Sequence, residues 1–134
     1  MPIYSALRYR DAPAAIEWLE RALGCETVER IDNPDGTIAH AELRLGDGLI
    51  MLGSGAEGLQ DPPDDARAAR ATIYVALADV DALHARAKAA GADVSDLFDT
   101  DYGSRDFNTR DPEGNHWSFG TYVPQAAAAS PDSA

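Results

Sequence analysis

The chain has 134 residues, of which 45% are hydrophobic and 25% are charged, and its formal net charge is −12. This length is enough for one domain with a core that needs neither disulfide nor metal. The single cysteine, Cys25, excludes a disulfide framework and a cysteine-cluster zinc site. Acidic charge argues against a nucleic-acid partner, because the phosphates would be repelled. No signal peptide or long apolar run is present, so we expect a cytoplasmic protein with no membrane partner.

The first third of the chain predicts a strand, a helix and two more strands. Residues Pro2–Arg10 alternate as a strand does, with Tyr4 on the face away from Leu7 and Tyr9. Asp11 is a good N-cap for the helix that follows, and Gly24 is its expected end. Ile16, Leu19 and Leu23 form the buried side of this helix. Strands are then expected over Glu26–Asp32 and Thr37–Leu45.

Asp47–Gly48 predicts a two-residue hairpin turn, which would pair Leu45 with Ile50 and Leu43 with Leu52. Alternation then separates the two faces of the hairpin. The expected core face carries Ala39, Ala41, Leu43, Leu45, Ile50 and Leu52. The opposite face carries His40, Glu42, Arg44 and Met51.

The segment Gly53–Arg70 has no usable periodicity and predicts a linker or a mobile flap, with Leu59 as its only large apolar side chain. Alternation returns over Ala71–Ala78, where Thr72 and Tyr74 lie opposite the core face. Asp79 or Asp81 is the expected cap of a second helix, which Gly91 should end. The tail over residues 124–134 has nothing large to bury, and we expect it to be disordered.

The stretch Asp101–Tyr122 predicts a second hairpin. Its DPEG sequence is typical of a three-residue loop in which Asp111 faces Asn115. That register places Thr109 beside Trp117 and Phe107 beside Phe119 on an apolar face. The other face is polar and carries Asp106, Asn108, Arg110, His116, Ser118 and Gly120.

The two halves repeat one pattern of strand, capped helix and three strands. Asp11 corresponds to Asp79, Gly24 to Gly91 and Gly48 to Gly114, in the same order and at nearly constant separation. The sequence therefore predicts an α+β fold made of two βαβββ units, over about residues 2–53 and 71–123, joined by a linker over 54–70. The helices would cover the outside of a curved mixed sheet. Its concave side would form a small-molecule pocket between the units.

The paired βαβββ units, the opening LRYRDAPAAIEWLERALG and the closing YGSRDFNTRDPEGNHWSFGTY resemble the vicinal oxygen chelate superfamily, over about residues 2–123. This superfamily includes glyoxalases I, extradiol dioxygenases and the fosfomycin and bleomycin resistance proteins. The chain looks closest to the bleomycin-resistance-like and uncharacterised glyoxalase-like branches. The resemblance implies a homodimer that closes the pocket between units.

The resemblance also locates the metal ligands of the superfamily's enzymes, which are histidines or glutamates on the inner faces of four strands. Carried onto this chain, those positions hold Tyr4, Met51, Thr72 and Ser118, none of which is a usual ligand for zinc, nickel or iron. We therefore expect no metal and no other cofactor. A site made of His40, His116 and Glu42 is a minor alternative.

Three functions remain open at this stage. The first is a protein that sequesters an aromatic or cationic molecule, and the second is a metal-independent glyoxalase-like lyase or isomerase with His40 or His116 as general base. The third is a dimer without a natural small ligand. Tyr102 and Arg105 join the candidates because they belong to the recognised motif. The candidate ligand-binding residues are Tyr4, His40, Glu42, Met51, Thr72, Tyr74, Tyr102, Arg105, Asp106, Asn108, His116 and Ser118.

Overall fold

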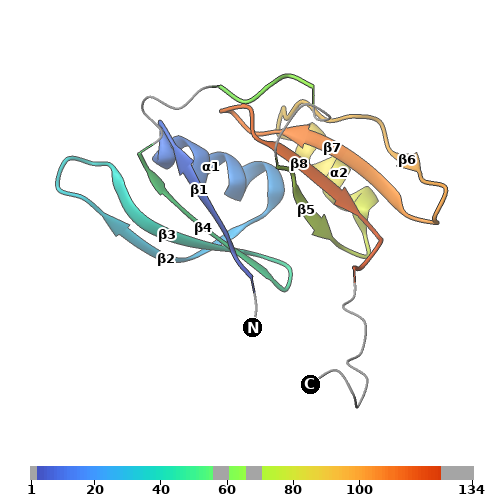
Figure 1. The fold of residues 1–134 in the computed structure, drawn as a ribbon, viewed down its shortest axis with the longest axis horizontal. Helices are drawn as coiled ribbons and strands as arrows, with labels where there is room; N and C mark the ends of the chain where they lie inside the picture. Colours follow the sequence, from blue (N-terminus) through green and yellow to red (C-terminus); the bar gives the residue numbers. More distant parts are fainter. Residues whose placement is uncertain (1–2, 56–60, 66–70, 125–134) are drawn as a thin grey trace, which may run out of the picture.

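The computed structural model describes residues 3–55, 61–65 and 71–124, and it contains two βαβββ units (Figure 1). The first unit comprises β1 (Ser5–Tyr9), α1 (Ala12–Leu23), β2 (Glu26–Asp32), β3 (Ile38–Leu45) and β4 (Gly48–Ser54). The second comprises β5 (Ile73–Ala76), α2 (Val80–Ala89), β6 (Phe98–Asp99), β7 (Arg105–Arg110) and β8 (His116–Gly120). Leu59 of the expected flap and most of the tail lie outside the described residues.

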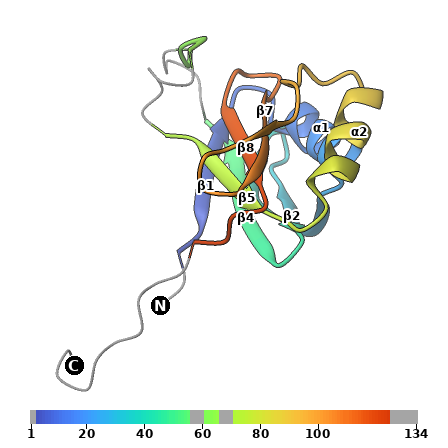
Figure 2. The ribbon, with the colours of Figure 1, turned by 90° about the vertical axis from the view of Figure 1, so that its right-hand side faces the viewer.

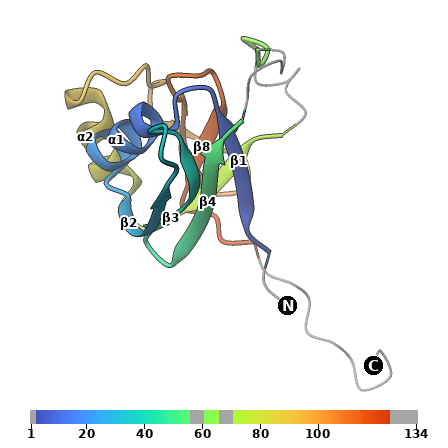
Figure 3. The same ribbon diagram turned by 90° about the vertical axis from the view of Figure 1, so that its left-hand side faces the viewer.

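The predicted repeat is confirmed by the sheet topology. One sheet has the order β1-β4-β3-β2 and the other has the order β5-β8-β7-β6. In each sheet the first strand of the unit runs parallel to the last, and the other neighbours are antiparallel. The strands form two open four-stranded sheets rather than one continuous curved sheet. Figures 2 and 3 show the two helices together on one side of the strands.

Both helices begin at the caps that the sequence predicts. The Asp11 carboxylate accepts a hydrogen bond from the Ala14 amide at 3.2 Å, and Gly24 ends α1 in the left-handed region with φ 73°. Asp79, not Asp81, caps α2 by accepting from the Ala82 amide at 3.1 Å. Each helix turns its apolar side to the core, where Ile16, Leu19 and Leu83 are buried. Neither helix in the described part is long and apolar enough to cross a membrane.

The predicted turn of the first hairpin is wrong: the observed turn lies one residue earlier, so each pairing partner differs from the prediction by two residues. Leu45 pairs with Gly48 and Leu43 with Ile50, so Gly46 and Asp47 form the loop. Gly46 has φ 59°, the positive value that the first central position of a type II′ turn requires. Because the error is an even number of residues, the faces of this hairpin keep their predicted orientation.

Ala39 was expected on the core face but is exposed, while the neighbouring Ile38 is buried. The cause is a register shift in the pairing of β2 with β3. Ile31 pairs with His40, whereas Asp32 pairs with Ile38, so one extra residue of β3 is left between these pairs. Such a bulge reverses the alternation of side chains at that point.

The second hairpin has the predicted register. Asp111 pairs through its backbone with Asn115, Thr109 lies opposite Trp117, and Phe107 lies opposite Phe119. The rings of Phe107 and Phe119 stack with their centroids 4.8 Å apart, and both side chains are fully buried. The predicted apolar face therefore packs against the helices, and the polar face points away from them.

The hairpin loop also joins the two units, through Asp111 and Glu113. The buried Asp111 carboxylate accepts hydrogen bonds from the Tyr9 hydroxyl at 2.6 Å and from the Trp117 indole at 3.2 Å. Burial and this carboxylate raise the pKa of Tyr9 far above its usual value. Glu113 accepts from the amides of Arg10 and Asp11, next to the start of α1, at 2.7 and 2.8 Å. Residues about one hundred positions apart thus hold the units together.

Candidate functional site

We use the name trough face for the side of each sheet that points away from the helices. On the first sheet, Met51 lies between Ala6 of β1 and Glu42 of β3 in one cross-strand row. His40 and Glu42 are hydrogen-bonded on this face at 2.8 Å, and both side chains are about one-third exposed. Tyr4 lies just before β1, two residues from the row that contains Met51, and it is exposed.

The trough face of the second sheet brings together more of the predicted residues. Tyr74, Ser118 and Asn108 form one cross-strand row. The next row contains Ala76, Gly120 and Asp106. Thr72 is exposed and precedes β5. This face therefore presents an aromatic ring, hydroxyls, an amide and a carboxylate within two neighbouring rows.

The linker segment 61–65 covers the far end of this face. The His116 imidazole, which is buried, is hydrogen-bonded to the Pro63 carbonyl at 2.6 Å. Beside it, Arg110 donates to the Asp64 carboxylate at 2.8 Å. His116 is therefore engaged by the backbone of the linker, whereas His40 of the first sheet faces a carboxylate.

Two residues of the recognised motif lie apart from these rows. Arg105 is on the helix side of β7, where it pairs with Asp81 at 2.7 Å and with Asp99 at 3.4 Å. Tyr102 is exposed in the loop before β7, and its ring meets that of Tyr122 edge-on with the centroids 5.6 Å apart. The structure thus places Arg105 in a surface ion pair and leaves Tyr102 at the rim of the second sheet.

A cavity of about 470 Å³ lies between the outer strands β1 and β5. Its walls are mainly apolar and aromatic, and Asp47 is the only acidic or basic side chain among the described residues that line it. Burial raises the pKa of the Cys25 thiol in this wall to about 12, so the thiol is protonated at neutral pH. Typical lining residues are Tyr4, Ile50, Ile73, Tyr74 and Trp117.

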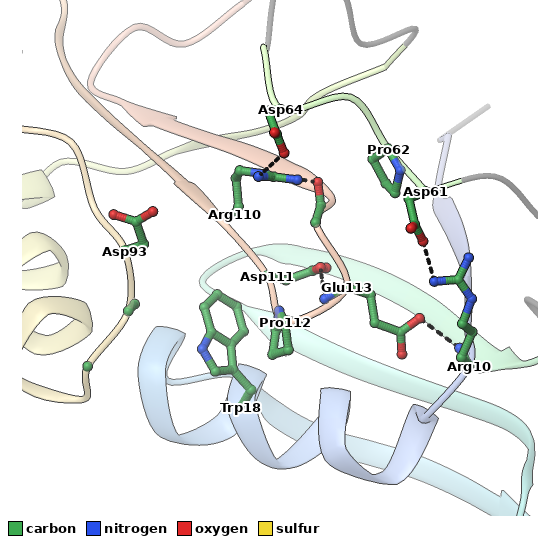
Figure 4. A pocket seen from close by; sticks show the side chains of 13 residues that line it. Arg10, Trp18, Asp61, Pro62, Asp64, Asp93, Arg110, Asp111, Pro112 and Glu113 are labelled. Atoms are coloured by element: carbon green, nitrogen blue, oxygen red, sulfur yellow. Dashed lines mark hydrogen bonds and ion pairs between the residues drawn. The ribbon is translucent and has the colours of Figure 1, made fainter.

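A second cavity, of about 590 Å³, lies where α1, the linker and the hairpin loop meet (Figure 4). Trp18 and Pro112 provide apolar surface there, and Asp93 adds a carboxylate. The two arginines of this wall already have partners, since Arg10 pairs with Asp61 and Arg110 with Asp64. These ion pairs attach residues 61–65 of the linker to the two units. Both arginines are neutralised by the linker, so their presence in the wall does not indicate an anionic ligand.

The residues at the expected metal-ligand positions do not fit a transition metal. A tyrosine, a methionine, a threonine and a serine occupy them, and the thioether and hydroxyl groups are poor ligands for zinc or nickel. Within residues 3–55, 61–65 and 71–124, no three side chains of His, Cys, Asp or Glu are grouped so that they could hold an ion.

Comparison with known proteins decides the family. The family model of the Glyoxalase/Bleomycin resistance protein/Dioxygenase superfamily matches residues 3–119. The chain belongs to this superfamily. A protein of Mycobacterium bovis described as uncharacterized is 35% identical over 118 residues, which cover 84% of this chain and 78% of the relative.

Solved structures agree with this assignment to the superfamily. The crystal structure of TioX from Micromonospora sp. ML1 is 31% identical with a TM-score of 0.72, and the match covers 91% of this chain and all of TioX. The fosfomycin resistance protein FosX from Mesorhizobium loti has a TM-score of 0.63 at 15% identity, and the match covers 92% of each chain. FosX therefore supports the fold alone, while TioX is both a structural and a sequence relative.

Sequence reasoning missed several residues around Asp106. The Ser104 hydroxyl donates to the Asp106 carboxylate at 2.5 Å, and the backbone amide of Tyr122 donates to that same hydroxyl at 3.1 Å. The Tyr74 hydroxyl donates to the Tyr122 carbonyl at 2.5 Å. Ser104 and Tyr122 lie outside the regular strands, so their side chains follow no alternation that would have revealed them.

Proposed function

We propose that this chain binds a small organic molecule of aromatic or cationic character on its trough faces and sequesters it without covalent change. The observation that carries this proposal is the cavity of about 470 Å³ between β1 and β5, at the edge of the trough faces. Of the twelve candidate residues only Tyr4 and Tyr74 line it, and the rest of its wall is formed largely by helix-side residues such as Ile50, Ile73 and Trp117. Its volume lies in the range of small-molecule sites, and its mainly apolar lining is typical of them. The absence of suitable ligands at the four expected metal positions favours binding over metal-dependent turnover.

In this proposal the predicted residues divide by chemistry. Tyr4, Tyr74 and Met51 offer surface for an aromatic ring. Asn108, Ser118 and Thr72 supply hydrogen-bonding groups that orient the ligand. Glu42 and Asp106 supply negative charge for a cationic group.

A second candidate function is a metal-independent lyase or isomerase of glyoxalase-like type. The contact that favours it is the 2.8 Å hydrogen bond between His40 and Glu42 on the trough face. A carboxylate that accepts from one imidazole nitrogen leaves the other nitrogen as a proton acceptor, which is the arrangement of a general base. His116 is less suited to this role, because its buried ring is held by the Pro63 carbonyl.

We also propose that the protein acts as a homodimer. β1 and β5 pair on one side only among the described strands, and large apolar side chains at the edge of the first unit are exposed, such as Val28 and Ile31. A second copy would cover such edges and apolar surface. Sedimentation at micromolar concentration that shows only a monomer would contradict this.

The experiment that tests the main proposal is a thermal-shift screen of aromatic, cationic and neutral natural products, with and without divalent metals. A ligand present at one hundred times its dissociation constant stabilises the folded state by about 2.7 kcal/mol, which is readily detected. Mass spectrometry of each bound compound after incubation separates sequestration from turnover. Unchanged compound supports sequestration. Conversion that is lost in His40→Ala and kept in His116→Ala would favour the enzyme.

A further inference from the structure

Two carboxylates of the same hairpin are buried to the same extent but have different surroundings. Asp111 is 5% exposed and accepts from Tyr9, Trp117 and Asn115, as well as from the Glu113 amide. Asp106 is 6% exposed, and the Ser104 hydroxyl is its only hydrogen-bond donor among the described residues. A buried carboxylate normally needs several donors or a cation, because losing water destabilises its charge.

No cationic side chain of the described segments forms an ion pair with Asp106. Its neighbour in sequence, Arg105, points to the helix side and is paired with Asp81. Arg110 lies on the same face but four residues along β7, about 13 Å away at the rise of a strand, and it pairs with Asp64. Every fully buried side-chain oxygen of the described residues has a hydrogen-bond partner. The second Asp106 oxygen accepts no hydrogen bond from these residues, so it is not fully buried and keeps some contact with solvent.

Aromatic residues lie on the strands and loops next to this carboxylate. A Cβ atom placed on Gly120 would lie 2.2 Å from an Asp106 oxygen and 2.7 Å from the Tyr74 hydroxyl, so both groups lean into the space that the glycine leaves. Partial burial, and more weakly the charge of Asp106, raise the pKa of Tyr74. Phe98 is the cross-strand partner of Asp106 on β6, and Tyr102 stands edge-on to Tyr122.

These aromatic rings are accessible to a ligand. Tyr74, Phe98, Tyr102 and Tyr122 are 37%, 41%, 67% and 51% exposed. Aromatic faces attract cations, and rings grouped beside a carboxylate are a recognised way to bind organic ammonium ions. The unpaired charge supplies the attraction and the rings supply the apolar contact.

We propose that Asp106, with Tyr74, Phe98, Tyr102 and Tyr122 around it, is a subsite for the ammonium group of an organic cation. This inference rests on the proposed small-molecule function and names the ligand class for it. A divalent metal is a poor occupant, since a single carboxylate and neutral hydroxyls give too few charged oxygen ligands. A neutral ligand would leave the carboxylate charge uncompensated.

The test uses the full chain and two probes of equal shape, phenethylammonium and 2-phenylethanol, titrated at pH 7 and followed by NMR chemical shifts. We expect the amine to bind about tenfold or more tightly than the alcohol, with shifts at β5, β7 and β8. Asp106→Asn should weaken the amine by about tenfold and leave the alcohol unchanged. Asparagine keeps an oxygen for the Ser104 hydroxyl, so this variant retains the local hydrogen bond.

Asp96→Asn is the matched control, because it removes the same charge from an exposed position of the same unit, and it should leave the affinity for the amine unchanged. Tyr102→Leu is a second test at an exposed site, where the substitution should not affect folding. It should weaken binding of the amine by roughly threefold. Equal affinity of both probes for the unmodified protein, binding of neither, or full retention of amine binding in Asp106→Asn would overturn the inference.

The thermal-shift screen distinguishes failure of the ammonium subsite from failure of the proposed small-molecule function. If neutral aromatic compounds stabilise the unmodified protein and Asp106→Asn alike in the thermal-shift screen, small-molecule binding stands and the ammonium subsite falls. If no compound of any charge is bound, both fall.

Discussion

Replacing Asp111 with alanine should destabilise the fold strongly, because this carboxylate accepts the hydrogen bonds of the buried Tyr9 hydroxyl and Trp117 indole. The Tyr9 side chain is 0% exposed and Trp117 is 1% exposed, so neither the hydroxyl nor the indole N–H can turn to water. A buried donor left without an acceptor costs about 1–3 kcal/mol, and two of them therefore cost about 2–6 kcal/mol. The amides of Glu113 and Asn115 also lose this acceptor, but they lie in a partly exposed loop.

This loss is large relative to the roughly 5–15 kcal/mol by which a typical domain is stable. Urea unfolding followed by tryptophan fluorescence measures it, since Trp18 and Trp117 are both in the core. Asp96→Ala is the control and should stay within about 0.5 kcal/mol of the parent, as is usual for exposed positions. A loss below about 1 kcal/mol in Asp111→Ala would show that Tyr9 and Trp117 find other acceptors, and the reasoning would be wrong.

Three further predictions concern Glu113, Tyr9 and the expected metal-ligand positions. Glu113→Ala should lower the free energy of unfolding by about 0.5–2 kcal/mol in urea titrations, because it removes the acceptor of the Arg10 and Asp11 amides just before α1; an unchanged midpoint would contradict this. The pKa of Tyr9 is higher in the folded state than its value of about 10 in the unfolded chain. The stabilisation that protonated Tyr9 gives the fold is therefore complete below about pH 10 and is lost as the pH rises above it. Stability should therefore fall above about pH 10, by up to about 1.4 kcal/mol per pH unit from this group, and Tyr9→Phe should flatten the fall. Finally, elemental analysis of protein purified without chelator should return far less than one equivalent of zinc, nickel or iron, since Tyr4, Met51, Thr72 and Ser118 are unsuitable ligands.

Local chemistry explains the parts of the fold that the sequence predicts correctly. Asp11 and Gly24 mark the ends of α1 through capping contacts within the helix itself. The DPEGN loop fixes the register of the second hairpin for the same reason. The turn of the first hairpin is predicted incorrectly because Gly46 and Gly48 flank Asp47, and either glycine can supply the positive φ of a two-residue turn.

The candidate site is less predictable, because its properties depend on side chains from separate segments. Alternation correctly assigns Asp106, Asn108 and Ser118 to one face of the second hairpin. It does not reveal that Asp106 is buried, since that depends on the loop that carries Ser104. It also does not reveal that Pro63 of the linker covers His116.

The recognised motif thus contains two kinds of polar residue, and the count of hydrogen-bond partners separates them. Asp111 accepts hydrogen bonds from Tyr9 of the first unit and from Trp117 and Asn115 of its own hairpin, and Glu113 accepts from two amides of the first unit. The oxygens of both carboxylates are therefore occupied by contacts that stabilise the fold. Among the described residues Asp106 has one hydrogen-bond donor and lies beside exposed aromatic residues, which is why we propose it as the ligand-binding carboxylate. Membership of a shared motif therefore does not by itself assign a residue to the binding site. In this chain the unpaired carboxylate, not the most connected one, is where ligand recognition is expected.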